Sequence, residues 1–227
     1  MNSNDTRSAR GRTIGQTAMP FIRTLFMVIL AAGVAGPASS QESEKGEDVP
    51  KPAEEGQEVA VIKTNHGTIV LEFLPDVAPK MVQNFKDLAN DKFYDGTTFH
   101  RVIPNFMIQG GDPLSKDDNP NNDGTGDGPR KMPAEFTTKY SHEKGTVSTA
   151  RGGDPNSGSC QFFIVHKLSP HLDNKYTIFA RVIEGIDVVD KIAAVPTGCT
   201  GKPRGTRGCS TQPIEKVVME SVTIETR

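Results

Sequence analysis

The chain has 227 residues and a formal net charge of -2, with 26 basic and 28 acidic side chains. This balance gives no electrostatic reason to expect a nucleic-acid partner. The 22 glycines and 16 prolines, together with short apolar runs and no internal repeat, favour a mainly β architecture over a helical bundle.

The first forty residues are typical of a secretory signal. Four arginines flank or precede an apolar run over 25–36, and the small residues Ala38 and Ser40 occupy the positions that a signal peptidase reads. We therefore expect 1–40 to be a signal peptide cleaved near Ser40-Gln41, which would leave the protein periplasmic or extracellular. A permanent membrane anchor is the alternative, but the run is shorter than the roughly 20 residues needed to span a bilayer. We expect no stable membrane insertion after cleavage.

Residues 41–57 carry an excess of acidic side chains, two prolines and no apolar periodicity. This composition predicts a disordered acidic linker. The remaining residues, 58–227, number about 170, which is enough for one domain with a single core but not for two.

The domain opens with two β-rich runs, 58–64 and 68–74, separated by Asn65-His66-Gly67, which predicts a hairpin. Asp76 then stands ahead of a segment whose apolar residues recur at helical spacing through 78–89, and Asp76 is a residue type that caps helices. A second, shorter helix is predicted over 186–193.

Between and after the helices lie short apolar runs that read as further strands. They cover 98–103, 106–109, 145–150, 161–166, 176–182 and 217–226. Strands that outnumber two short helices predict a closed antiparallel barrel, because closure removes the exposed edges of short strands.

The sequence lacks the patterns of several common enzyme classes: a nucleophile elbow, a phosphate-binding loop, and a second histidine that would make a zinc site with His142-Glu143. The segment 94–111 stands out instead, because an apolar strand carrying Arg101 leads to Phe106-Met107 and then to Gln109-Gly110-Gly111. It resembles the signature of the cyclophilins, a family of peptidyl-prolyl cis/trans isomerases. The resemblance continues through Gly124-Thr125-Gly126, Ala150-Arg151, Gln161-Phe162-Phe163 and the run from His171 to Tyr176.

The resemblance implies a closed eight-stranded antiparallel β-barrel capped by two α-helices, with an external groove for proline-containing peptides. Position by position, the resemblance implies that the catalytic candidates are Arg101, Gln109 and Phe106. The substrate-binding candidates are His100, Met107, Gly124, Ala150, Arg151, Gln161, Phe163, His171, Leu172 and Tyr176. An apolar floor would hold the proline ring, while Arg101 and Gln109 would bind amide groups.

The implied reaction needs no nucleophile, so we expect no cofactor and no metal. Arg101 is expected to stabilise the twisted X-Pro amide, in which the prolyl nitrogen regains a lone pair. The expected substrates are proline-containing segments of exported proteins, and we expect a monomer. The alternative is a non-catalytic proline-peptide-binding or chaperone module of the cell envelope.

Two features depart from the family pattern. His171 stands where cyclosporin-sensitive relatives carry a tryptophan, so the resemblance implies weak binding of that drug. The loop 113–123 is rich in oxygen-bearing side chains that suit calcium, but its spacing fits no EF-hand and the same residues suit a solvated loop.

Cys199 and Cys209 flank a glycine-rich insertion in a chain that we expect to be exported. We therefore predict that they form a disulfide, with three free thiols as the alternative. Cys160 lies in an apolar run and is predicted to be a buried thiol.

Overall fold

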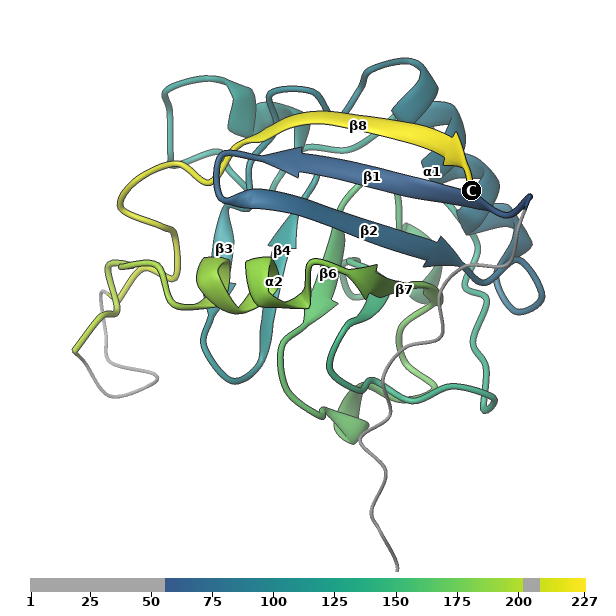
Figure 1. Cartoon of the computed structure of the whole chain (residues 1–227). Helices are drawn as coiled ribbons and strands as arrows, with labels where there is room; N and C mark the ends of the chain where they lie inside the picture. Colours follow the sequence, from purple (N-terminus) through teal and green to yellow (C-terminus); the bar gives the residue numbers. More distant parts are fainter. Residues whose placement is uncertain (1–55, 202–208) are drawn as a thin grey trace, which may run out of the picture. The chain divides into compact units, whose positions relative to one another are not determined.

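The computed structural model describes residues 56–201 and 209–227, and within them one curled antiparallel sheet of eight strands (Figure 1). The strands are β1 (Glu58–Thr64), β2 (Gly67–Phe73), β3 (Arg101–Ile103), β4 (Met107–Gly110), β5 (Thr146–Thr149), β6 (Phe162–Val165), β7 (Ile178–Glu184) and β8 (Met219–Thr226). Their order across the sheet is β3-β4-β6-β5-β7-β2-β1-β8, in which the pairs β1-β2, β3-β4 and β5-β6 are neighbours both along the chain and in the sheet. The signal peptide and most of the linker predicted over 1–57 lie outside the described residues.

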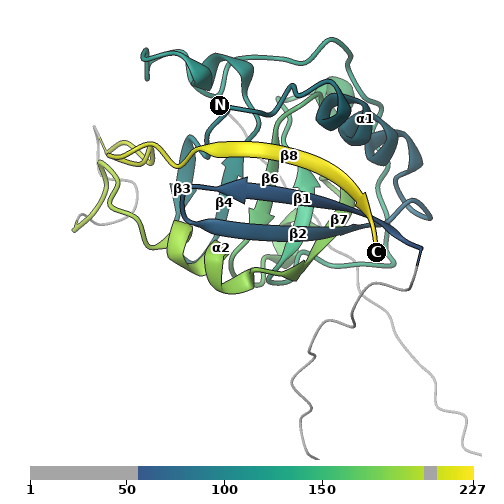
Figure 2. The ribbon, with the colours of Figure 1, turned by 45° about the horizontal axis from the view of Figure 1, so that its top comes forward.

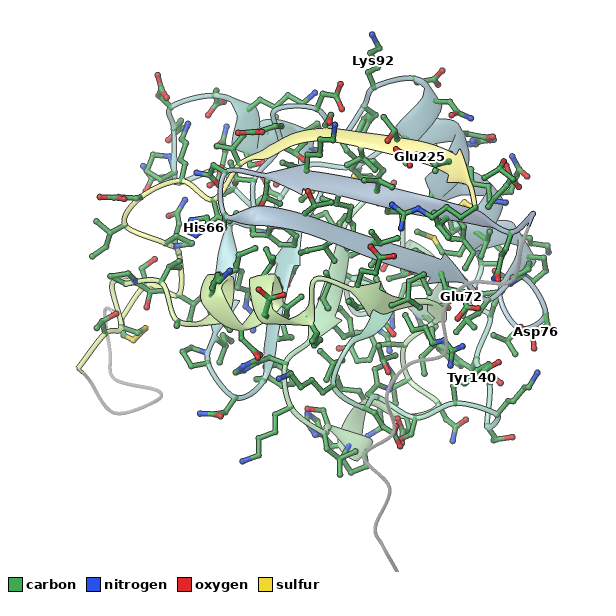
Figure 3. The ribbon with its side chains drawn as sticks, viewed as in Figure 1. His66, Glu72, Asp76, Lys92, Tyr140 and Glu225 are labelled. Carbon is green, nitrogen blue, oxygen red and sulfur yellow. A yellow bond between two sulfur atoms is a disulfide. The ribbon has the colours of Figure 1, made fainter. Side chains whose placement is uncertain are left out.

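The predicted hairpin pairs β1 with β2 in an antiparallel ladder, in which Val59 lies opposite Glu72 at one end and Thr64 lies opposite Gly67 at the other. Alternate residues of both strands enter the interior of the curl, as the period of a strand requires. The opposite face carries polar side chains such as Glu72 on β2 and Glu225 on β8 (Figure 3). Glu72 accepts a hydrogen bond from Arg181 on β7, which ties the second strand to its other neighbour.

The chain forms two α-helices, α1 (Pro79–Asn90) and α2 (Ile186–Ala193). In Figure 2, α1 lies above β8 and α2 lies below β2, so the helices flank the three strands β8, β1 and β2. Both contribute to the same main core, in which Phe85 of α1 contacts Tyr94, Phe162 and Phe179 with ring centroids 4.9–5.5 Å apart. The interior of the curl is thus filled with side chains.

The expected cap of α1 is wrong. Asp76 lies too far ahead of Pro79 to reach the first free N–H groups, and its carboxylate forms an ion pair with Lys139 instead. Glu135 takes the capping role from a distant loop, since its carboxylate accepts hydrogen bonds from the N–H groups of Lys80 (3.1 Å) and Met81 (2.9 Å). A carboxylate at this end of the helix also complements the helix dipole.

The sheet is curled but open, which corrects the expectation of a closed barrel. The end strands β3 and β8 share no ladder in the described residues. Irregular chain ahead of each strand makes the contact, through an isolated bridge between Thr98 and Val218 and a bond from the Phe99 N–H to the Val217 carbonyl (2.9 Å). With only three residues, β3 is too short to form a regular ladder with β8, which is the pairing that would close the sheet.

Within the described residues, no helix is long and apolar enough to cross a membrane. Cys160 is a free thiol with no exposed surface, and burial raises its pKa to about 12, which makes it unreactive at neutral pH.

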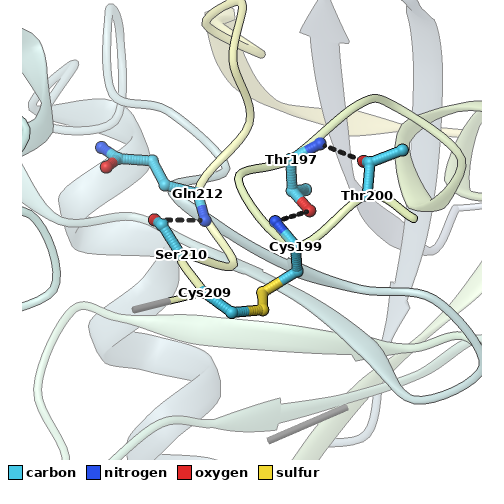
Figure 4. Close-up of a disulfide and its surroundings, with 6 residues drawn as sticks. All are labelled: Thr197, Cys199, Thr200, Cys209, Ser210 and Gln212. Atoms are coloured by element: carbon cyan, nitrogen blue, oxygen red, sulfur yellow. Dashed lines mark hydrogen bonds between the residues drawn. A yellow bond between two sulfur atoms is a disulfide. The ribbon is translucent and has the colours of Figure 1, made fainter. Parts of the chain in front are cut away.

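Cys199 and Cys209 are joined by a disulfide, with their Cα atoms 4.7 Å apart (Figure 4). Side-chain turns shape both flanks: the Thr197 hydroxyl accepts from the Cys199 N–H (3.2 Å), and the Ser210 hydroxyl accepts from the Gln212 N–H (3.2 Å). The bond closes a loop of which 202–208 lie outside the described residues.

We predict that an unreduced digest of the protein will contain the Cys199 and Cys209 peptides as one cross-linked species by mass spectrometry. Closing a loop this short should stabilise the folded state by about 2–3 kcal/mol on the chain-entropy model, so reduction should lower the free energy of unfolding by that amount. Recovery of the two peptides separately, with free thiols, would contradict the prediction.

Candidate functional site

The candidate site is built on the outer face of the strands β3, β4 and β6. Arg101 lies directly opposite Gln109, and Gln109 lies directly opposite Phe163, so the three side chains form one row across three strands. Residues two positions along a strand share a face, which places Met107 on the same side as Gln109. The intervening residues, Val102 and Ile108, enter the main core.

A second apolar cluster forms on this outer face, separate from the main core. Its buried members are Met107, Phe163, Val165 and Leu172, with Ile103, Phe106, Ala150 and Tyr176 packed against them. The strand β6 is therefore buried on both faces, and β4 carries buried Met107 on its outer face and Ile108 in the main core.

A hollow of about 100 Å³ opens in this cluster. It is lined by Arg101, Phe106, Met107, Gln109, Ala150, Arg151, Phe163, Leu172 and Tyr176. The volume suits one small ring or side chain, and its lining combines apolar surface with two guanidinium groups and one amide.

A chain of amide hydrogen bonds fixes the polar side of the hollow. The Arg101 Nη1 donates to Gln109 Oε1 (3.0 Å), and Gln109 Nε2 donates to Gln161 Oε1 (3.0 Å). Gln161 Nε2 in turn donates to the carbonyls of Gly124 (3.1 Å) and Gly126 (2.8 Å). Because each amide is oriented by the next, the guanidinium of Arg101 is held against the row.

Arg101 forms no ion pair with a carboxylate of the described residues. Partial burial lowers the pKa of its guanidinium, but the group keeps its charge at neutral pH, because an arginine side chain does not lose its proton in proteins. The hollow thus holds a cation whose remaining N–H groups are available to a ligand.

Arg151 lies on the opposite rim and is used differently. Its guanidinium packs 4.8 Å from the centre of the Tyr176 ring and donates to the carbonyl of Lys175 from Nε (3.0 Å) and Nη2 (2.7 Å). The side chain therefore fastens the segment that carries Tyr176 to the rim.

Most of the residues predicted for the site come together. The nine that line the hollow were all expected from the sequence, Gly124 and Gln161 line an adjoining hollow of about 290 Å³, and His171 stacks on Phe106 with ring centroids 5.5 Å apart.

His100 is the exception. Its side chain is 6% exposed and lies beneath the Gly124 loop rather than in the hollow. Since Arg101 points outward at the start of β3, the preceding residue points inward, and the expected contact of His100 with substrate stays a prediction.

The structure also brings one unexpected residue to the site. His142 is buried behind Phe163 and Tyr176, with its ring centroid 6.0 Å and 6.4 Å from theirs. Its place in the sequence, ahead of Glu143, gives no signal of this role, because the contacts depend on strand pairings far along the chain.

In the described residues, no group of three or more His, Cys, Asp or Glu side chains is arranged to hold a metal ion. The oxygen-rich loop that follows Gly111 bonds to its own backbone: Asp112 accepts from the N–H groups of Leu114 (2.8 Å), Gly124 and Gly126 (3.2 Å). Its buried carboxylate is thus used to shape the loop beside Gln161.

Comparison with known proteins gives a consistent result. The family model for "Cyclophilin type peptidyl-prolyl cis-trans isomerase/CLD" matches residues 59–224. "Peptidyl-prolyl cis-trans isomerase B" of Streptomyces anulatus is 40% identical over 185 residues, which cover 74% of this chain and 97% of the relative. "Peptidyl-prolyl cis-trans isomerase-like 2" of Gibberella zeae is 41% identical over 150 residues, which cover 63% of this chain but only 24% of that longer relative.

A solved structure matches as well. The crystal structure of a cyclophilin type peptidyl-prolyl cis-trans isomerase from Cryptosporidium parvum, in the presence of the dipeptide Ala-Pro, is similar with a TM-score of 0.64 and 27% sequence identity. The match covers 74% of this chain and 99% of that chain.

Proposed function

The chain belongs to the cyclophilin-type peptidyl-prolyl cis-trans isomerases, and on this premise we propose that it accelerates rotation about X-Pro bonds in peptide segments bound across the 100 Å³ hollow. The observation that carries the proposal is the row of Arg101, Gln109 and Phe163, which sets amide-binding groups beside an apolar pocket for a small ring. The substrates are proline-containing segments of unfolded or folding proteins.

The reaction is a rotation and breaks no bond. Amide resonance imposes a barrier of about 20 kcal/mol, so the uncatalysed step takes tens to hundreds of seconds. As the bond twists, the prolyl nitrogen becomes pyramidal and regains a lone pair. A guanidinium N–H of Arg101 aimed at that nitrogen stabilises the twisted amide more than either planar isomer, which is the requirement for catalysis.

The other groups of the hollow bind and orient the peptide. Phe106, Met107 and Leu172 offer apolar surface to the pyrrolidine ring in both planar isomers. Gln109 is bonded at Oε1 to Arg101 and through Nε2 to Gln161, which leaves one amide hydrogen for a peptide carbonyl. Gln109 therefore acts mainly by holding the guanidinium in place.

The test is exchange NMR on a proline-containing tetrapeptide with the purified protein. We expect cis/trans exchange to become faster in proportion to enzyme concentration, and the peptide signals to shift on binding. The competing function is a non-catalytic module that only holds proline segments. Such a module would shift the peptide signals and leave the exchange rate unchanged. The guanidinium of Arg101, which forms no ion pair within the described residues, favours the enzyme, because a pure binder needs no donor at the twisted nitrogen.

We further propose that the enzyme acts on exported proteins. The support is the signal-like composition of residues 1–40 together with the disulfide between Cys199 and Cys209, since such bonds persist in oxidising compartments.

We predict that the mature protein isolated from its native cells begins at Gln41. N-terminal sequencing of the protein from envelope and medium fractions measures this directly. A change of Ala38 and Ser40 to arginine, which a signal peptidase does not accept, should leave the precursor uncut. A mature chain that still begins at Met1 or Met19 would contradict export by this route.

A further inference from the structure

A buried histidine stands directly behind the hollow and is bonded at both ring nitrogens. His142 has no exposed surface, its Nδ1 lies 2.7 Å from Asp173 Oδ1, and its Nε2 lies 2.9 Å from the hydroxyl of Ser148. Burial raises the pKa of Asp173, but hydrogen bonds from Ser141 and His142 outweigh it, so this carboxyl stays ionised and can only accept. Nδ1 must then carry the proton, and Nε2 accepts from Ser148.

The ring held in this way supports two walls of the hollow. It lies nearly parallel to the Phe163 ring, with an interplanar angle of 17° and centroids 6.0 Å apart, and it meets the Tyr176 ring edge-on at 6.4 Å. Phe163 and Tyr176 also contact each other edge-on at 5.5 Å. The three rings form one packed unit, of which Phe163 and Tyr176 also line the hollow.

Asp173 connects the same histidine to the rim. It lies between Leu172 and Tyr176, both of which line the hollow. Besides the ring of His142, its carboxylate accepts hydrogen bonds from the His142 N–H (2.9 Å) and the Ser141 hydroxyl (2.6 Å). The segment 170–176 is thereby fastened to the chain just ahead of β5.

We infer that His142 is a positioning residue of the proposed isomerase, fixing Phe163 and Tyr176 through its hydrogen bonds to Ser148 and Asp173. The inference rests on the proposed function, since it assigns the histidine a part in shaping the peptide site. His142 does not touch the hollow, so it acts through the two aromatic side chains.

The alternative interpretation of Ser148, His142 and Asp173 is the catalytic triad of a Ser-His-Asp hydrolase. The order of contacts agrees with such a triad, in which the histidine takes the serine proton. Ser148, however, has no exposed surface and lies in β5 beside Phe163, its direct cross-strand neighbour. A substrate carbonyl cannot reach its hydroxyl, so the trio orders the site and does not cleave bonds.

The decisive variant is His142→Phe, which keeps a ring of similar size and removes both hydrogen bonds. We expect the affinity for a proline tetrapeptide to fall about tenfold, because Phe163 and Tyr176 grip both isomers, while the exchange rate at saturation changes by less than about threefold. Asp173→Asn keeps an acceptor for Nδ1 and should retain affinity within about threefold. Tyr94→Phe is the matched control, since it removes one buried hydrogen bond from the main core and should leave peptide affinity unchanged.

All variants are studied as the full purified chain by line-shape NMR, which gives affinity and exchange rate in one sample. Wild-type affinity in a folded His142→Phe variant would overturn the inference, and so would an equal loss of affinity in Tyr94→Phe. If His142→Phe does not fold, the ¹⁵N spectrum of the wild-type ring decides: we expect protonated Nδ1 and bare Nε2, and the opposite tautomer overturns the inference.

The ring signals of Phe163 and Tyr176 separate this inference from the proposed function. In His142→Phe we expect both rings to shift and to broaden, whether or not the wild-type protein catalyses exchange. Unchanged ring signals would count against the inference alone. Failure of the wild-type protein to accelerate exchange would count against the proposed function alone.

Discussion

Replacing Arg101 with alanine should slow X-Pro isomerisation by about two decades at saturating peptide, while peptide affinity falls much less. Two decades correspond to about 2.7 kcal/mol of lost transition-state stabilisation. The reason is that the donor acts chiefly on the twisted amide, whose nitrogen regains its lone pair only near the top of the barrier. Apolar residues such as Met107 contact the proline ring in every state, so truncating them should weaken binding as well as turnover.

Two further variants sharpen this test. Arg101→Lys should restore little of the lost rate, because a lysine ammonium lacks the planar set of N–H donors with which a guanidinium bonds to Gln109 and to the prolyl nitrogen at the same time. Arg181→Ala makes the same chemical change on β7, where the side chain is bonded to Glu72 outside the hollow, and should leave the rate unchanged. Line-shape NMR measures rate and affinity together. An Arg101→Ala variant that binds ten times more weakly, yet isomerises bound peptide at the wild-type rate, would make Arg101 a binding residue only.

The parts of the fold that depend on local sequence were predicted best. The helix over Ile186–Ala193 has the predicted bounds, and Gly185 before it adopts a φ of 82° where a Cβ would meet the Thr68 carbonyl at 2.2 Å. β3 was predicted too long, because the Thr98 N–H is bonded to the Ser115 hydroxyl and not to a strand. That bond joins chain segments on either side of β4 and has no signal in the apolar run.

The residues of the site also divide into those that local sequence predicts and those that depend on distant contacts. A contiguous motif predicted Arg101, Phe106 and Gln109, since two short antiparallel strands fix their spacing. The positions of His100 and His142 depend instead on which face of a strand turns inward and on pairings between β5, β6 and the 170–176 segment. Sequence supplies the residue types for such contacts but not the register that brings them together.

These two buried histidines should make the folded state sensitive to mild acid. Burial lowers the pKa of His100, against the opposing effects of Asp112 and the Thr98 backbone, and burial likewise lowers the pKa of His142, against Asp173. Both groups are therefore neutral in the folded chain at a pH where the unfolded chain, with a histidine pKa near 6.5, already binds protons.

Because the unfolded state binds more protons in this window, the free energy of unfolding should rise with pH up to about 6.5 and fall as the solution becomes more acidic. Each histidine contributes a slope of at most about 1.4 kcal/mol per pH unit between its folded-state pKa and 6.5, so the two together lower stability by up to roughly 3 kcal/mol per unit. The stabilising effect of the depressed carboxyl pKa of Asp173 is lost only at lower pH, since that group titrates below 3.8.

Urea unfolding followed by circular dichroism at half-unit steps from pH 7.5 to 5 measures this slope. His100→Phe should remove about half of it whatever the variant does to absolute stability, because the phenylalanine ring takes up no proton. Tyr94→Phe should lower stability by the same amount at every pH in the range, since the buried phenol, whose pKa burial raises well above 10, stays protonated throughout. A free energy of unfolding that is flat between pH 7 and 5, or a His100→Phe variant with the full wild-type slope, would show that these histidines are not held neutral by the fold.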